Sequence, residues 1–147
     1  MSWHEIHSKK DIDKLMEFYG EFHDSCIKEI RYVSGAFVDE DRSMYPVDSE
    51  RILSVVFQSQ EKGVGALELM FIGLNKLSLV PRKENYDCII LEASLVQYDG
   101  LFYWSEWSDF TIADINEVEG TWISAKKIAW RQIPNGLGED EIFTMNK

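Results

Sequence analysis

Four adjacent residues, His23, Asp24, Ser25 and Cys26, supply the side-chain types that an enzyme could use as nucleophile, base and orienting group. In catalytic triads, such side chains come together from separate parts of the fold. In an extended chain, neighbouring side chains point to opposite faces, so four consecutive residues do not meet at one point. We therefore interpret the stretch as a junction between a helix and a strand, where Asp24 or Ser25 satisfies free backbone groups.

Glu92 is a further candidate for chemistry, because it stands on the polar face of an otherwise apolar, strand-like segment, residues 88–97. If that face lines a cavity, Glu92 is its best-placed acid, and if it does not, the side chain faces water. A small-molecule-binding or hydrolytic protein with a pocket between helix and sheet would use His23, Asp24, Cys26 or Glu92 as ligand-binding residues.

The common motifs of catalysis and metal binding are missing from the sequence. It contains no phosphate-binding glycine pattern and no serine in the setting of a nucleophile elbow. His4, His7 and His23 lack the close spacing of zinc ligands. Residues 39–50 place acids as an EF-hand does, but Met44 stands where that loop needs glycine for its sharp turn. The sequence predicts no catalytic residue, no cofactor and no metal site.

Composition limits the class of protein. The 147 residues carry 15 Lys and Arg against 26 Asp and Glu, a formal charge of −11, and this length predicts one domain, residues 1–147. Nucleic acids and anionic membranes are excluded as partners, since binding them requires basic side chains. No apolar run is long enough for a signal peptide or a membrane span, so we expect a cytoplasmic protein. Cys26 and Cys88 are predicted to be buried free thiols, with a disulfide between them as the alternative.

The acidic excess is concentrated in residues 39–50 and 105–120, and a basic protein is the partner that this field would attract. The aromatic stretch 102–107 places large rings on both faces of a strand, so one face must cover the helix, a second subunit in a homodimer, or a ligand. The residues expected to contact a partner are Asp39, Asp41, Glu106, Trp107 and Asp109.

The sequence pattern predicts which elements position these residues. Apolar residues recur at helical spacing in residues 8–19, with Ser8 as N-cap and Gly20 after the last turn. Alternating apolar residues predict about seven strands after this helix. The predicted strands are residues 26–38, 52–60, 66–72, 77–80, 88–97, 101–107 and 122–133.

The links between these segments do not provide the helical crossovers that parallel strands require, so the sheet should be antiparallel. We expect an α+β fold in which the N-terminal helix packs on a strongly bent, mostly antiparallel sheet, with a barrel-like or sandwich arrangement as the alternative.

Residues 22–35, FHDSCIKEIRYVSG, resemble a stretch shared by small bacterial cytosolic proteins with no known activity, in which a short helix leads through a His-Asp junction into a long strand. The stretches ALELMFIGLNKLSLVP and ASLVQYDGLFYW are similar to the same group, so the resemblance covers most of the chain. It implies a bacterial cytosolic α+β domain and carries over no functional residue. In size and charge, the chain also resembles the immunity proteins that neutralise bacterial toxins.

Two functions remain open at this point. The favoured one is a non-enzymatic acidic interaction domain, with immunity-type binding of a basic protein as its most concrete form. The alternative is a small-molecule-binding or hydrolytic protein. The two differ in whether the candidate ligand-binding residues converge on a cavity.

Overall fold

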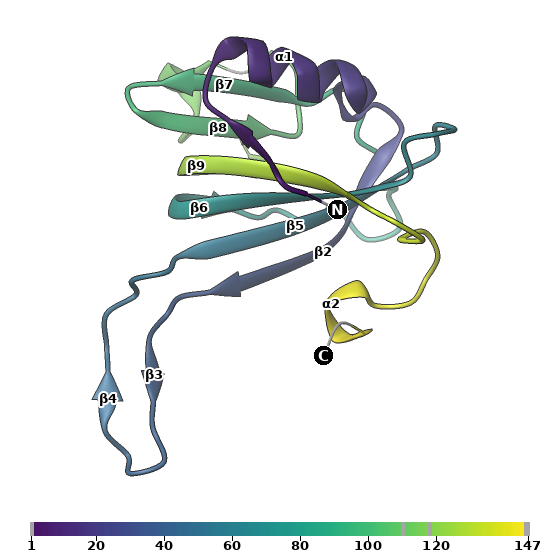
Figure 1. Cartoon of the computed structure of the whole chain (residues 1–147). Helices are drawn as coiled ribbons and strands as arrows, with labels where there is room; N and C mark the ends of the chain where they lie inside the picture. The colour runs from purple at the N-terminus through teal and green to yellow at the C-terminus, as the bar shows by residue number, and fades with distance from the viewer. Residues whose placement is uncertain (1, 110, 118, 146–147) are drawn as a thin grey trace.

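The computed structural model describes residues 2–109, 111–117 and 119–145. Residues 1, 110, 118, 146 and 147, which belong to the predicted domain and in part to the acidic stretch 105–120, lie outside this description. The described chain forms a twisted antiparallel sheet, with helix α1 (Lys9–Phe18) lying along one side and a long β-hairpin projecting from one end (Figure 1).

The sheet contains seven strands in the order β2-β5-β6-β9-β8-β7, and β1 pairs with the remaining free edge of β9. A separate pair, β3 and β4, forms the projecting hairpin. The strands are β1 (His4–Ile6), β2 (Ser25–Val33), β3 (Phe37–Val38), β4 (Met44–Tyr45), β5 (Ile52–Ser59), β6 (Ala66–Ser78), β7 (Ser94–Tyr98), β8 (Leu101–Ser105) and β9 (Trp122–Ile133). The short helical elements are η1 (Gly20–Phe22), η2 (Ile112–Asp114) and α2 (Ile142–Met145).

The expected antiparallel sheet is confirmed, and it is not closed into a barrel. The fold is mainly β, so the expected α+β class describes it only in part. The predicted strands 66–72 and 77–80 form one long strand, β6, which pairs with β9 along most of its length. β1 was not predicted, because a three-residue strand is too short to show an alternating pattern.

The described helix α1 begins after Ser8, whose side chain accepts a hydrogen bond from the Asp11 backbone N–H at 3.4 Å. The chain turns after Tyr19 at Gly20, whose φ of +57° is the left-handed conformation that glycine adopts without strain. Ile12 and Leu15 are the buried residues of α1, and they belong to the same core cluster as the inner residues of the sheet.

Three aromatic rings join the helix–strand junction to the centre of the core. The Phe22 ring lies 4.8 Å from that of Phe57 and 5.8 Å from that of Trp104, and the Phe57 and Trp104 rings lie 5.3 Å apart, measured between centroids. All three side chains are buried. Edge-to-face and tilted contacts of this kind add stabilisation to the burial of the rings.

The predicted strand 88–97 is wrong in its first half. Strand β7 begins only at Ser94. Leu91, which precedes Glu92 in the expected alternation and was therefore predicted to point inward, is 73% exposed, whereas Ile90 is 1% exposed. Ile90 is held in an isolated antiparallel bridge with Ser25, in which the Ile90 N–H donates to the Ser25 carbonyl at 2.8 Å. This segment therefore docks on the helix–strand junction and brings its neighbours close to residues 21–24.

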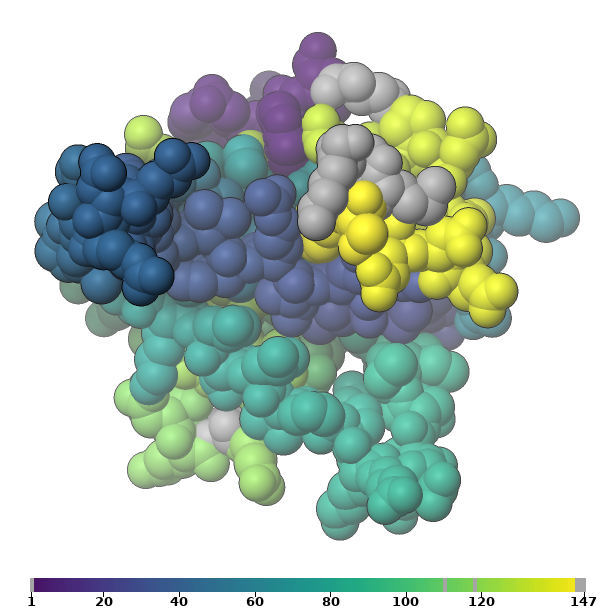
Figure 2. All heavy atoms as spheres, turned by 90° about the horizontal axis from the view of Figure 1, so that it is seen from below, coloured from purple at the N-terminus to yellow at the C-terminus, as the bar shows by residue number. Residues whose placement is uncertain are grey.

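The second face of the sheet is partly covered by the C-terminal segment, which Figure 2 shows lying over β2. Glu29 of β2 fixes α2, because its carboxylate accepts hydrogen bonds from the backbone N–H groups of Ile142 at 2.7 Å and Phe143 at 3.2 Å. Further along this face, the Arg131 guanidinium lies 4.4 Å over the Trp3 ring and 2.9 Å from the Glu68 carboxylate.

Candidate functional site

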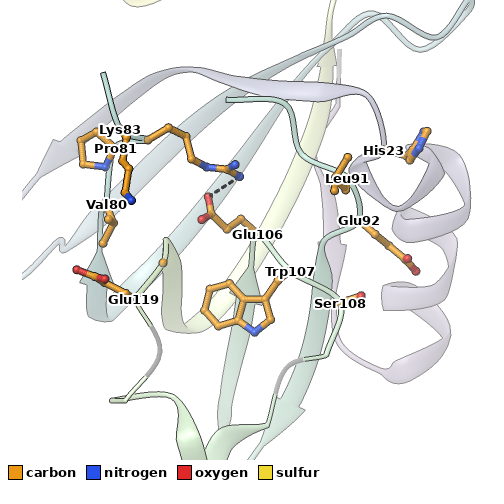
Figure 3. Close-up of a pocket in the computed structure, with 12 residues that line it drawn as sticks. His23, Val80, Pro81, Lys83, Leu91, Glu92, Glu106, Trp107, Ser108 and Glu119 are labelled. Carbon is orange, nitrogen blue, oxygen red and sulfur yellow. Dashed lines mark ion pairs between the residues drawn. The ribbon is translucent and has the colours of Figure 1, made fainter. Parts of the chain in front are cut away.

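A pocket lies between two loops that leave the sheet, one joining β6 to β7 and the other joining β8 to β9. Its volume is about 990 Å³. It is lined by His23, Val80, Pro81, Arg82, Lys83, Leu91, Glu92, Glu106, Trp107, Ser108, Glu119 and Gly120. Figure 3 shows His23, Leu91 and Glu92 on one side of this loop pocket, Pro81 and Lys83 on the opposite side, and Glu106 and Trp107 between them.

The position of Trp107 in the loop pocket is set by its surroundings. The Ser94 and Ser105 hydroxyls donate to its backbone carbonyl at 3.0 and 2.9 Å. A Cβ atom on Gly120 would lie 2.7 Å from the indole ring, so glycine is needed for the ring to lie this close to the backbone. The ring is therefore a fixed wall of the pocket.

Thr121 joins the two loops next to this wall. Its hydroxyl accepts from the Val80 N–H at 3.0 Å and donates to the Val80 carbonyl at 3.3 Å, and its backbone carbonyl accepts from the Glu106 N–H at 3.1 Å. Because Thr121 belongs to the β8–β9 loop and bonds to Val80 of the β6–β7 loop, the separation of the two loops at the base of the pocket is defined.

The central charged group of the loop pocket is the Glu106 carboxylate. Its side chain is only 16% exposed, and its cationic partner is the Arg82 guanidinium at 3.7 Å, drawn as the dashed line in Figure 3. The Arg82 side chain is 39% exposed. The distance of 3.7 Å is longer than the 2.7–2.9 Å typical of charge-assisted hydrogen bonds, so the ion pair between Arg82 and Glu106 is a loose one.

The side of the pocket formed by His23, Leu91 and Glu92 holds two neighbouring carboxyl groups, those of Glu21 and Glu92, close to the His23 imidazole. A hydrogen bond with Glu21, and then the negative charge of that residue, raise the pKa of Glu92 above its ordinary value of 4.5. The charges of Asp109 and His23 also act on Glu92, the first raising and the second lowering its pKa. The His23 Nδ1 atom lies 3.2 Å from the Asp24 carboxylate.

The four predicted ligand-binding residues are only partly brought together. His23 and Glu92 line the loop pocket, whereas Asp24 contacts His23 and Cys26 lies at the start of β2 outside the lining. Burial, followed by the charge of Cys88, raises the pKa of Cys26. The pocket that His23 and Glu92 line lies between loops, whereas the sequence led us to expect one between helix and sheet.

Both cysteines are free, as predicted, but the expected burial is not found for either one. Cys26 is half-buried, and Cys88 is exposed because the segment that contains it loops outward. Ser25 takes the structural role expected at the junction. It is buried, and its hydroxyl donates to the Phe22 carbonyl at 2.5 Å.

The predicted partner-binding residues fall into two regions. Glu106 and Trp107 belong to the loop pocket, and Asp109 lies next to it in the same loop and is exposed. Asp39 and Asp41 lie in the projecting hairpin (Figure 1). Sequence analysis missed Arg82 and Lys83 of the pocket, because a basic pair in a polar loop shows no sign of facing a carboxylate across a cavity.

Residues 34–51, which we call the arm, contain strands β3 and β4 and extend well beyond the sheet in Figure 1. At the base of the arm, Gly35 has a φ of +96°, and its missing Cβ leaves room for the Glu50 backbone nitrogen. The Phe37 and Tyr45 rings stack with centroids 4.6 Å apart. Five large apolar side chains of the arm are 50–69% exposed: Phe37, Val38, Met44, Tyr45 and Val47.

Asp39 shapes the end of the arm. Its Oδ1 atom accepts hydrogen bonds from the backbone N–H groups of Asp41 at 2.9 Å and Ser43 at 3.0 Å, while Arg42 adopts a φ of +71° in the turn. Asp39 is therefore occupied with the turn, whereas Glu40 and Asp41 are exposed.

Across the described residues, no three His, Cys, Asp or Glu side chains are close enough together to hold a metal ion. Within the same residues, no helix has the length and apolar character needed to cross a membrane. Comparison of the chain with protein-family models, curated proteins and solved structures finds no match.

Proposed function

We propose that this protein is a non-enzymatic interaction domain that binds a basic protein partner, and that the arm is its main contact surface. The observation that carries this proposal is the set of five exposed apolar side chains on a hairpin that projects from the sheet. Exposed apolar groups that are contiguous and surrounded by polar residues are typical of protein interaction sites.

Charge supports a basic partner over a second copy of the chain. The arm carries five acidic residues against Arg42 and Arg51, within a chain of formal charge −11. Two copies would repel each other, whereas a cationic surface would be attracted and guided to the arm. Immunity-type inhibition of a basic toxin is one biological form that such binding would take.

Affinity capture with the immobilised protein tests this proposal. We expect it to retain one or a few basic proteins from a lysate of the source cells at about 0.05 M salt and to lose them near 0.5 M, because ions screen exposed charges. The double variant Phe37→Ser/Tyr45→Ser should lose the same proteins. Binding of the captured protein, once purified, would then be measured by calorimetry.

A matched control separates the arm from net charge. Asp41→Asn removes one exposed acid from the arm, and Glu117→Gln removes one exposed acid from the β8–β9 loop. We expect the first variant to bind the captured protein more weakly and the second to bind it like wild type. Equal binding by wild type and the Phe37→Ser/Tyr45→Ser variant would exclude the arm as the contact surface.

The loop pocket supports a second candidate function, small-molecule binding. Its carrying observation is that His23, Glu92, Glu106 and Trp107, all singled out in the sequence, line one cavity. Hydrolysis would also require a nucleophile within hydrogen-bond reach of a base, and the described ion-pair partner of the His23 imidazole is the neighbouring Asp24 carboxylate. Binding is therefore the function that we propose for this cavity.

Chemical-shift changes at the Trp107 indole N–H, recorded while a library of small polar molecules is screened, would test binding in the loop pocket. Gly120→Ala should reduce any binding found, because the added Cβ would force the indole ring to move. If no molecule shifts this resonance, the second candidate function is wrong, while the proposal for the arm is unaffected.

A further inference from the structure

We propose that the loop pocket recognises a guanidinium group, held by the Glu106 carboxylate and the Trp107 ring in place of the side chain of Arg82. This inference rests on the second candidate function, ligand binding in the loop pocket, and is independent of the arm. It names the chemical class of the ligand: a free guanidino compound or an arginine side chain of a polypeptide.

The protein itself contains a complete example of the proposed chemistry. On the other face of the sheet, the Arg131 guanidinium lies 4.4 Å over the Trp3 ring, and its Nη2 atom is 2.9 Å from Glu68 Oε1. The Arg131 Nε also donates to the same oxygen at 3.0 Å. A guanidinium is suited to this arrangement because it is planar, stacks on aromatic rings and carries several N–H donors in one plane, two of which here reach the same carboxylate oxygen.

The loop pocket also presents a carboxylate, that of Glu106, beside an indole ring, that of Trp107. Glu106 is largely buried, and its Oε2 atom is 3.7 Å from Arg82 Nη2, which is 0.8 Å longer than the contact between Arg131 and Glu68. Trp107 is fixed beside Glu106 by Gly120 and by the two serine hydroxyls. Arg82 extends from a loop and is partly exposed, so it can move aside when a better-placed guanidinium enters.

The charges around the pocket also favour a cationic ligand. Three carboxylates line it, those of Glu92, Glu106 and Glu119, against Arg82 and Lys83. Glu21 and Asp109 add negative charge beside Glu92, since both raise its pKa. An anionic ligand would meet this surplus of carboxylates, whereas a cation of +1 would balance part of it.

Calorimetry with small, uniform probes tests the proposal. The probes are Nα-acetyl-arginine amide, its lysine counterpart and its citrulline counterpart, which keeps the shape of arginine without the charge. We expect the arginine probe to bind about tenfold more tightly than the other two, because only a guanidinium combines charge, planarity and paired donors. The Trp107 indole N–H resonance locates the binding.

Two substitutions should weaken binding of the arginine probe. Glu106→Gln removes the carboxylate and Trp107→Leu removes the ring, and each should reduce affinity about tenfold. Glu40→Gln, which removes one acid from the arm, is the matched control and should bind like wild type. Thermal unfolding and amide spectra of each variant establish that it is folded.

A third substitution distinguishes this proposal from general attraction of cations. Because Arg82 competes for Glu106, Arg82→Ala should bind the arginine probe several-fold more tightly, in proportion to the fraction of time that Arg82 occupies the site. Lys62→Ala removes one positive charge from the β5–β6 hairpin, outside the loop pocket, and should have little effect. Equal effects of the two substitutions would overturn the proposed competition.

These experiments distinguish failure of guanidinium recognition from failure of the pocket to bind any ligand. They also distinguish a free guanidino compound from an arginine of a polypeptide. If the lysine or citrulline probe binds as tightly as the arginine probe, the pocket binds ligands but the guanidinium proposal is wrong. If no probe binds, guanidinium recognition is wrong, and the library screen still decides whether the pocket binds anything. Agmatine binding more tightly than a capped Gly-Gly-Arg-Gly-Gly peptide would indicate a free compound, and the reverse order would indicate a polypeptide.

Discussion

Single residues determine how the chain passes from α1 to β2. Glu21, Phe22 and Asp24 have φ values of +56°, +63° and +58°, a conformation that costs free energy for any residue except glycine. Such conformations persist only where the surrounding structure enforces them. Two kinds of contact hold this conformation here. The buried Phe22 ring packs against Phe57 and Trp104, and the Ser25 hydroxyl donates a hydrogen bond to the Phe22 carbonyl.

Ser25→Ala should therefore destabilise the fold by about 1–3 kcal/mol, because it leaves the Phe22 carbonyl in a buried site without its hydroxyl donor. Urea denaturation measures this change in the free energy of unfolding. Ser43→Ala, at an exposed position in the arm, should change it by less than about 0.5 kcal/mol. Equal effects of the two substitutions would contradict the role given to Ser25.

The pairing of Glu21 with Glu92 predicts a pH effect. Because the folded-state pKa of Glu92 is raised, the folded protein holds this proton at pH values where the unfolded chain has lost it. The pair therefore favours the folded state below the raised pKa, and this contribution disappears as the pH rises through that value. Glu21→Gln should lower the pKa of Glu92 toward 4.5, measured by NMR titration of its side-chain carboxyl carbon.

Glu40→Gln, in the arm, is the control for this titration and should leave the Glu92 curve unchanged. A Glu92 curve that does not move in Glu21→Gln would show that the hydrogen bond between the two carboxyl groups is absent in solution.

At the level of secondary structure, the arm is an element whose shape depends on its own turn more than on the core. Its four strand residues pair only with each other, and its apolar side chains are largely exposed. The hydrogen bonds of Asp39 with the N–H groups of Asp41 and Ser43 are thus expected to define the end of the arm.

Asp39→Ala should loosen the arm without unfolding the sheet. We expect faster hydrogen exchange at the Asp41 and Ser43 amides, and a change of less than about 0.5 kcal/mol in the global free energy of unfolding. Glu40→Ala, the neighbouring exposed acid, should leave exchange at both amides unchanged. Unchanged exchange in Asp39→Ala would show that the turn is held by other contacts.

For the whole molecule, the acidic surplus acts on stability as well as on partner choice. A formal charge of −11 on a folded chain of 147 residues produces repulsion that expansion of the chain would relieve. Raising sodium chloride from about 0.01 M to about 0.15 M shortens the screening length from about 30 Å to about 8 Å. We expect the melting temperature at pH 7 to rise over this range, as measured by calorimetry, and a fall would contradict net repulsion.

The fold could be predicted from sequence where local patterns are strong. Residues 8–19 carry helical spacing and end signals, and the alternating segments placed β5 and β9 within a residue or two. Prediction failed at Gly73 and Leu74, where a positive φ and a register shift interrupt the pattern of β6 although the strand continues. From the sequence alone, an interruption of the apolar alternation inside a strand looks the same as the end of that strand.

The candidate site was predicted only as separate residues. His23 and Glu92 were each noticed for their chemistry, but their proximity depends on the bridge between Ser25 and Ile90, which joins segments 65 residues apart. The pattern placed Leu91 inside, whereas the bridge buries Ile90 instead. Contacts of this kind follow from tertiary packing and leave no local signal in the chain.

The position of β1 at the edge of β9 has a consequence for synthesis on the ribosome. His4, Glu5 and Ile6 pair with Trp130, Ala129 and Ile128, so β1 can be fixed only after β9 has been synthesised. Such pairing between distant segments is slow to form, because a large loop must close first. β1 therefore stays unpaired while the segments between it and β9 are synthesised, and its capture by β9 should follow the formation of the hairpins between them.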